Sequence, residues 1–149
     1  MGASAPPETD DMRGLRVAAI ELFAQDRMAE VIEPNVALAF HPDNAARLAP
    51  ARLEFVQRAG AGQLIAQNRA VMARPNARIH LPEVRCPTLV MCGDADRLAP
   101  PECSSVIAAM VPNAQLVLVQ NCGHVLTMEQ LDVVNATLVA WLETAVGRS

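Results

Sequence analysis

Two short apolar runs, separated by one helix-length segment, constrain the fold of this chain more than any other feature. The first is "CPTLVMCG" (residues 86–93) and the second is "AQLVLVQ" (114–120), with "PPECSSVIAAMVP" (100–112) between them. A continuous apolar run of this length, ended by glycine, is typical of a strand buried on both faces of a parallel sheet. The prolines that open the intervening segment indicate the start of a helix.

The second run is followed by the turn "NCGH" (121–124) and by "TMEQLDVVNATLVAWLETAV" (127–146), which has the apolar spacing of a long amphipathic helix. Strand, helix, strand and helix in this order predict a right-handed parallel crossover unit. In such sheets, sites lie at the carboxyl ends of the strands. The segments "GDAD" (93–96) and "NCGH" both follow a strand and are therefore expected at that rim.

The first half of the chain is expected to be helical, with Gly and Pro at its corners. Thr9 precedes acidic residues and an apolar periodicity, so it is the expected N-cap of the first helix. The expected helices are 9–26, 27–40 with a break or kink at Pro34, 50–59 and 63–73, and the expected loop is 41–50. The character of the sequence changes at Pro82.

Asp96 and His124 are the candidate catalytic residues. A carboxylate held against one imidazole nitrogen fixes the tautomer and leaves the other nitrogen free to accept a proton. Asp96 is preferred to Asp94 because Asp94 directly follows Gly93, whereas Asp96 lies at the tip of the turn, with Arg97 toward solvent. Asp-rich turns are more often only turns, and a histidine after glycine is more often a loop residue. The position of both at adjacent strand ends favours the catalytic interpretation.

Residues 81–143 resemble the carboxyl-terminal part of an α/β-hydrolase. The resemblance rests on the pattern G-x-x-D-x-x-x-P (Gly93, Asp96, Pro100) and on the G-H turn before the "MEQ" segment. It implies that Asp96 is the acid and His124 the base of a Ser-His-Asp triad.

The segment "QNRAVMARPNARIHLPEVRCPT" (67–88) resembles the lid inserted before the acid-bearing strand in enol-lactonase-like and haloperoxidase-like members, and "GASAPPET" (2–9) resembles the loop that enters that lid. The resemblance implies an α/β fold in two parts. Residues 1–80 would be a helical lid, or cap, and residues 81–149 the carboxyl-terminal β-α-β-α part of the core. The sheet would be incomplete.

The nucleophile of that family sits in a G-x-S-x-G elbow between a strand and a helix. None of the four serines has this setting: Ser4, Ser104, Ser105 and Ser149. Ser104 and Ser105 are expected inside a helix, facing away from the rim. Cys122, the alternative suggested by dienelactone-hydrolase relatives, is too near His124 in the turn to meet the imidazole in line. We therefore predict that the nucleophile is not in this chain.

Three residues of the last lid helix are candidate substrate-binding residues. Arg69 and Arg74 could meet a substrate carboxylate, and Met72 could line an apolar pocket; solvated arginines and helix packing are the alternatives left open. His41 and His80 lack ligand spacing to other His or Cys residues, so no metal and no other cofactor are expected.

Composition excludes several classes of function. The formal charge is −4, and all 12 basic residues are arginine, which predicts no nucleic-acid partner. No apolar run is long enough to cross a membrane, and the first residues do not resemble a secretory signal. The four cysteines form no C-x-x-C pair, which favours reduced thiols and a cytoplasmic protein.

An apolar strand with one partner leaves an edge that invites pairing with another chain. We expect a homodimer through this edge, a complementary amino-terminal hydrolase half, or low stability of the isolated chain. Two functions remain open: the acid–base part of an enzyme that cleaves a small-molecule ester, lactone or similar acyl bond, and a non-catalytic derivative of the same fold.

Overall fold

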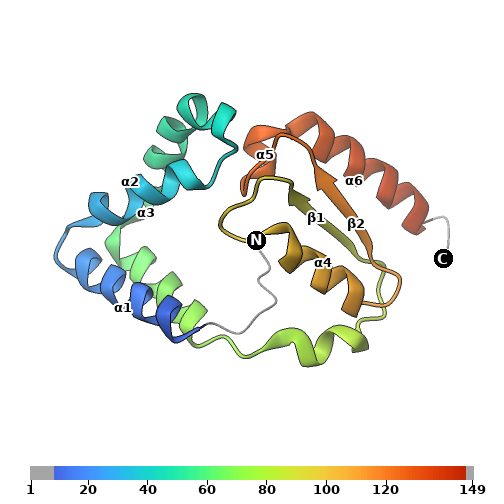
Figure 1. Cartoon of the computed structure of the whole chain (residues 1–149), viewed down its shortest axis with the longest axis horizontal. Coiled ribbons are helices and arrows are strands. Elements are labelled where there is room, and N and C mark those ends of the chain that lie inside the picture. The colour runs from blue at the N-terminus through green and yellow to red at the C-terminus, as the bar shows by residue number, and fades with distance from the viewer. Residues whose placement is uncertain (1–8, 147–149) are drawn as a thin grey trace.

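The two apolar runs form adjacent parallel strands, as predicted. The computed structural model describes residues 9–146. Strands β1 (Leu89–Gly93) and β2 (Gln115–Val119) are joined by α4 (Pro101–Met110) and pair in register, with Leu89 opposite Gln115 and Gly93 opposite Val119. Figure 1 shows the two strands between α4 and the closing helix α6 (Leu131–Val146). In the described residues the sheet has these two strands, so the β-α-β-α unit and its small sheet are as expected.

The first half of the described chain is helical and lies beside the strand unit in Figure 1, to which it is linked by residues 73–88. Its elements are α1 (Asp10–Ala24), α2 (Met28–Leu38), α3 (Pro42–Met72) and the 3₁₀ helix η1 (Ala77–Glu83). Thr9 caps α1, because its hydroxyl accepts a hydrogen bond from the backbone N–H of Met12 at 3.3 Å.

The hydrophobic core lies among these helices and is continuous with the turn after β2. Its buried members come from all three α-helices and the α2–α3 connection: Phe23, Ile32, Val36, Phe40, Leu48 and Leu64. Val125 and Met128 from beyond β2 pack against this cluster. The helical half is therefore held against the end of the sheet where the candidate residues lie.

Two expectations for the helical half were wrong. The segment 41–50 is not a loop, because His41 accepts a hydrogen bond from the Asp43 N–H and caps a helix that starts at Pro42. Helix α2 also continues through Pro34 without a break. The expected corner after residue 59 is confirmed, since the backbone leaves the helical region at Gly60, where φ is 75°.

The closing helix is also interrupted, which the sequence pattern did not predict. A short helix, α5 (Leu126–Glu129), ends at Gln130, and α6 begins at Leu131. The Gln130 amide donates to the backbone carbonyls of Gln120 and Asn121, at 3.3 and 3.2 Å. The interruption therefore ties the start of α6 to the turn after β2. No helix within residues 9–146 has the length and apolar character needed to cross a bilayer.

Candidate active site

Asp96 and His124 meet at the carboxyl ends of the two strands. The Oδ2 atom of Asp96 lies 2.9 Å from the Nδ1 atom of His124. Asp96 is 6 % exposed, whereas the His124 side chain is partly open to the surface. Because the ionised carboxylate can only accept, the imidazole donates from Nδ1, and its Nε2 lone pair is left free to accept a proton.

The second oxygen of Asp96 is held by its own turn. Asp96 Oδ1 accepts hydrogen bonds from the backbone N–H groups of Leu98, at 2.9 Å, and Ala99, at 2.8 Å. Asp94 has a different role, because its Oδ1 accepts from the Cys122 N–H at 3.1 Å and joins the two strand ends. Asp94 therefore connects the two strand ends, and Asp96 orients the imidazole of His124.

The rim requires glycine where two backbones approach closely. A Cβ at Gly93 would lie 2.6 Å from the backbone carbon of Cys122, and one at Gly123 would lie 2.6 Å from that of Phe40. Neither position has room for a side chain. The turn after β2 is therefore packed against β1 on one side and against the end of α2 on the other, which places His124 between them.

Glu129 connects this turn to the helical half, and sequence reasoning missed it. It is 9 % exposed. Its Oε1 accepts from the Gly123 N–H at 2.8 Å, and its Oε2 accepts from the His41 N–H at 2.8 Å and from the Asn44 amide at 3.1 Å. The His124 N–H also donates to the Ala39 carbonyl at 2.8 Å. These bonds satisfy a buried carboxylate and hold the histidine turn in place.

Two cavities meet at His124. One, of about 390 Å³, is open to the surface, is lined mainly by apolar side chains of α1, α2 and α3, and also reaches Leu98. The other, of about 600 Å³, runs along β1 between α4 and α6 and includes Asp96. The residues that line both are His124 and Arg52. A ligand in either cavity would therefore lie beside the imidazole.

The serines and Cys122 are placed as follows. Ser104 is buried and lines the cavity along β1 with Asp96 and His124, so the expectation that it faces away from the rim was wrong. Ser105 is exposed and donates to the Pro101 carbonyl at 3.0 Å. Ser4 and Ser149 lie outside the described residues. Within residues 9–146, no serine hydroxyl is hydrogen-bonded to His124.

All four cysteines are free thiols. Cys122 is fully buried, and burial beside Glu129 raises the pKa of its thiol to about 12. Burial also raises the pKa of Cys92. Because the thiolate is the nucleophilic form and the Cys122 thiol is protonated near neutral pH, Cys122 is poorly suited to act as a nucleophile.

The predicted substrate-binding residues do not line the cavities at His124. Arg69, Met72 and Arg74 lie at the end of α3 and just beyond it, and the Met72 carbonyl accepts from Arg13. Their role in substrate binding stays a prediction. Arg97 is exposed, as expected, but its Nη2 also donates to the Ala37 and Phe40 carbonyls, at 3.3 and 3.2 Å.

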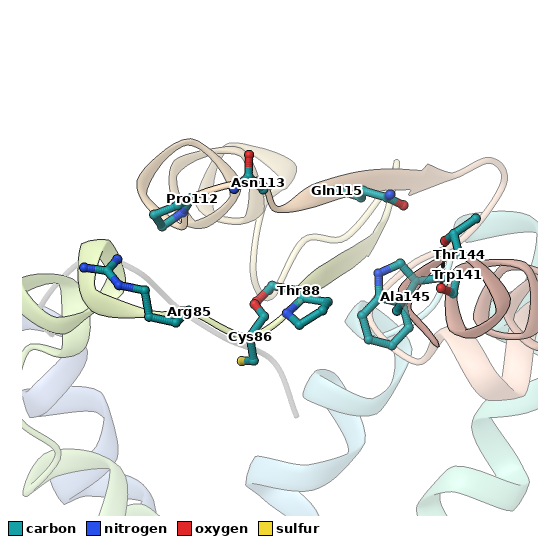
Figure 2. A pocket seen from close by; sticks show the side chains of 10 residues that line it. Arg85, Cys86, Thr88, Pro112, Asn113, Gln115, Trp141, Thr144 and Ala145 are labelled. Carbon is teal, nitrogen blue, oxygen red and sulfur yellow. Dashed lines mark hydrogen bonds between the residues drawn. The ribbon is translucent and has the colours of Figure 1, made fainter. Parts of the chain in front are cut away.

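A third pocket, of about 190 Å³, lies at the opposite end of the strands. Figure 2 shows Trp141 of α6 and Cys86, which precedes β1, on its wall. Arg85 of this pocket donates to the Pro82 carbonyl at 3.0 Å. It contains no paired acid and base, so the rim with Asp96 and His124 remains the candidate active site.

A rim of this kind, on a parallel crossover unit, defines the α/β-hydrolase class of fold, and comparison with known proteins agrees. Residues 2–137 match the Alpha/beta hydrolase family. The chain belongs to that family.

Individual relatives span more than this chain. A putative carbamate hydrolase, RutD, from Serratia proteamaculans is 35 % identical over 65 residues, which are 44 % of this chain and 24 % of that protein. A thermophilic esterase from Thermogutta terrifontis superposes with a TM-score of 0.82 at 23 % identity, covering 95 % of this chain and 53 % of the esterase. The enol-lactonase of Burkholderia xenovorans superposes with a TM-score of 0.78 at 19 % identity, covering 94 % of this chain and 53 % of the enol-lactonase. The chain thus spans about half the length of these solved structures and a quarter of the carbamate hydrolase.

Proposed function

We propose that this chain supplies the acid and base of a Ser-His-Asp triad that hydrolyses ester or lactone bonds. The observation that carries the proposal is the 2.9 Å contact between Asp96 Oδ2 and His124 Nδ1. The other carboxylate oxygen is occupied by two backbone N–H groups, so Asp96 is held in one orientation toward the ring. This is the geometry that a general base needs if its second nitrogen is to accept a proton.

In the proposed reaction, His124 Nε2 removes the proton from a serine hydroxyl as the serine oxygen attacks the acyl carbon. Asp96 stabilises the imidazolium that forms. His124 then returns the proton to the leaving alkoxide, which departs and leaves an acyl-enzyme. Water attacks the acyl-enzyme in the same way, and the acid and the free serine are regenerated. The helical half, residues 1–80, serves as the lid over this site.

The nucleophile is proposed to come from a G-x-S-x-G segment of a complementary amino-terminal hydrolase half, which pairs with the free edge of β1. Support comes from the cavity along β1, whose wall includes four consecutive strand residues, 89–92, between α4 and α6. Large apolar side chains of β2 and α6 are also exposed, among them Leu118, Val139 and Leu142. Exposed apolar area of this kind marks an interaction surface. A homodimer through the same edge is the alternative partner.

The test is hydrolysis of a p-nitrophenyl ester by the chain alone and after addition of an α/β-hydrolase amino-terminal half that carries the elbow. We expect activity only with both, lost in His124→Ala and retained in His80→Ala. His80 is an exposed histidine of η1 and is the matched control.

No activity in either sample would favour the other candidate, a non-catalytic derivative that keeps the rim geometry. Activity that survives His124→Ala would exclude the proposed base. The free thiols are consistent with a reducing compartment, and we place the activity in the cytoplasm, which fractionation of cells that express the protein would check.

A further inference from the structure

Arg52 stands at the junction of the two cavities that meet at His124. It projects from α3, is partly buried, and lines both the apolar cavity of the helical half and the cavity along β1. It shares this position with His124 and with no other described residue. A ligand that fills either cavity and has its reacting bond at the imidazole would therefore also lie beside the Arg52 guanidinium.

The other polar side chains of the apolar cavity already have partners. Arg16 donates to the Asn68 side chain at 3.3 Å, and the Asn68 amide donates to the Leu64 carbonyl at 2.9 Å. The Asn35 amide donates to the Val31 carbonyl at 2.7 Å. Each of these three side chains therefore forms a hydrogen bond within the protein.

Arg52 differs from them. Its guanidinium carbon lies 5.5 Å from the centre of the ring of Phe55, an exposed residue of the same helix that lines neither cavity. No carboxylate among residues 9–146 forms an ion pair with it. A guanidinium keeps its charge at all relevant pH values and presents N–H donors in a fork that matches a carboxylate. Because the arginine and the two asparagines beside it in this cavity already have partners, the ligand group complementary to Arg52 is an anion.

We propose that Arg52 binds a carboxylate of the substrate, so that the ester or lactone acted on at His124 carries a free carboxylate in its acyl part. This inference rests on the proposed function for the reacting bond, but the anion site itself does not depend on hydrolysis. A carboxylate is favoured over a phosphate because one guanidinium balances its single negative charge, whereas a phosphate monoester carries nearly two negative charges at neutral pH. The sequence suggested a contact of the same kind for Arg69 and Arg74, and their role stays a separate prediction.

The test measures binding to the full chain by NMR titration at pH 7, with monomethyl glutarate as the anionic ester and dimethyl glutarate as its neutral counterpart. We expect the anionic ester to bind more tightly and to shift the His124 ring resonances. Arg52→Gln should weaken its binding about 10- to 100-fold, the usual effect of losing a charged hydrogen-bonded pair, and leave the neutral ester unchanged. Arg52→Lys should give an intermediate loss.

Arg47→Gln is the matched control, because Arg47 is an exposed arginine of the same helix that lines neither cavity. The Arg47→Gln variant should bind monomethyl glutarate as tightly as the unmodified chain does. Equal affinities for the two esters, no binding of the anionic ester, or an Arg52→Gln variant that binds like Arg47→Gln would each overturn the inference. The amide spectrum of each variant establishes that it is folded.

The two proposals can fail separately. If the anionic ester binds through Arg52 but the reconstituted protein hydrolyses nothing, the anion site stands without the proposed hydrolase. If hydrolysis is restored but the neutral ester is preferred and Arg52→Gln has no effect, the hydrolase stands and the carboxylate specificity is wrong.

Discussion

The carboxylate of Glu129 accepts a hydrogen bond from the backbone N–H of Gly123, the residue before His124, at 2.8 Å. Its other oxygen accepts from the His41 N–H at the start of α3. One buried side chain thus holds the histidine turn on the helical half. Glu129 lies in α5, and its hydrogen-bond partners belong both to the turn before His124 and to the start of α3.

Replacement of Glu129 should therefore destabilise the protein. Glu129→Ala leaves buried N–H groups without an acceptor, at a cost of about 1–3 kcal/mol for each group left unsatisfied. Glu129→Gln retains one acceptor oxygen and should cost less. Urea denaturation measures both, with Glu33→Gln on the exposed face of α2 as the control. A Glu129→Ala midpoint equal to that of the control would show that the turn does not depend on this carboxylate.

Asp96→Asn should invert the tautomer of His124. The two backbone N–H groups of Leu98 and Ala99 need an acceptor, so the amide oxygen should take the place of Oδ1 and the NH₂ group should face the ring. His124 would then accept at Nδ1 and carry its proton on Nε2, which removes the base. Nitrogen-15 shifts of the imidazole distinguish the two tautomers. Asp94→Asn, which retains an acceptor for Cys122, should leave them unchanged.

Gly123→Ala should be strongly destabilising. Its Cβ would meet the backbone of Phe40 and His41, at 2.6 and 2.7 Å, and backbone cannot give way as a flexible side chain can. Overpacking of this kind costs roughly 1–3 kcal/mol or more. Gly62→Ala is the matched control, because its Cβ meets nothing within 4 Å and helical Ala is favoured over Gly by up to about 1 kcal/mol. Thermal denaturation should therefore move the two melting temperatures in opposite directions.

Stability should fall in alkaline solution because of Cys122. Burial raises the pKa of the Cys122 thiol in the folded chain to about 12, above the ordinary value of a free cysteine, so the unfolded chain releases the thiol proton first. Above about pH 9 the unfolded state binds fewer protons than the folded state, and the free energy of unfolding decreases until the pH approaches 12. The chain has no lysine and no tyrosine to titrate in the same range.

Urea midpoints between pH 8 and pH 11 measure this effect. Cys122→Ala should flatten the dependence, with the smaller slope that remains coming in part from Cys92, whose pKa is also raised. Cys86→Ala is the control, because Cys86 is exposed. The same slope in Cys122→Ala and in the unmodified chain would contradict the assignment.

The parts of the site that sequence could predict are those encoded locally. Two short apolar runs, the first ended by Gly93, predicted both strands, and the parallel arrangement brought Asp96 and His124 to one rim, where their contact is 2.9 Å. The distinction between Asp94 and Asp96 also followed from their distance from the end of β1. These inferences needed only the pattern of apolar residues along the sequence and the direction of the strands.

The parts that could not be predicted depend on contacts between distant segments. Glu129 looked like an acid near the start of a closing helix, and nothing local indicated that His41, 88 positions away, would donate to it. Pro42 looked like a loop residue and Pro50 like the start of a separate helix, although Pro42 opens a helix that is capped by His41 and continues through Pro50. Which arginines of α3 line the cavity depends on how the helix is rotated against α1 and α2, and the sequence carries no local signal for that.

The helical half reaches the histidine turn through main-chain groups. The Ala39 carbonyl receives the His124 N–H, the His41 N–H meets Glu129, and the Ala37 and Phe40 carbonyls receive Arg97. Backbone carbonyls are present in every residue, and a backbone N–H is present in every residue except proline. The side chains of the helical half can therefore change without loss of most of the bonds that hold the histidine turn, so the two faces of this contact are free to vary independently.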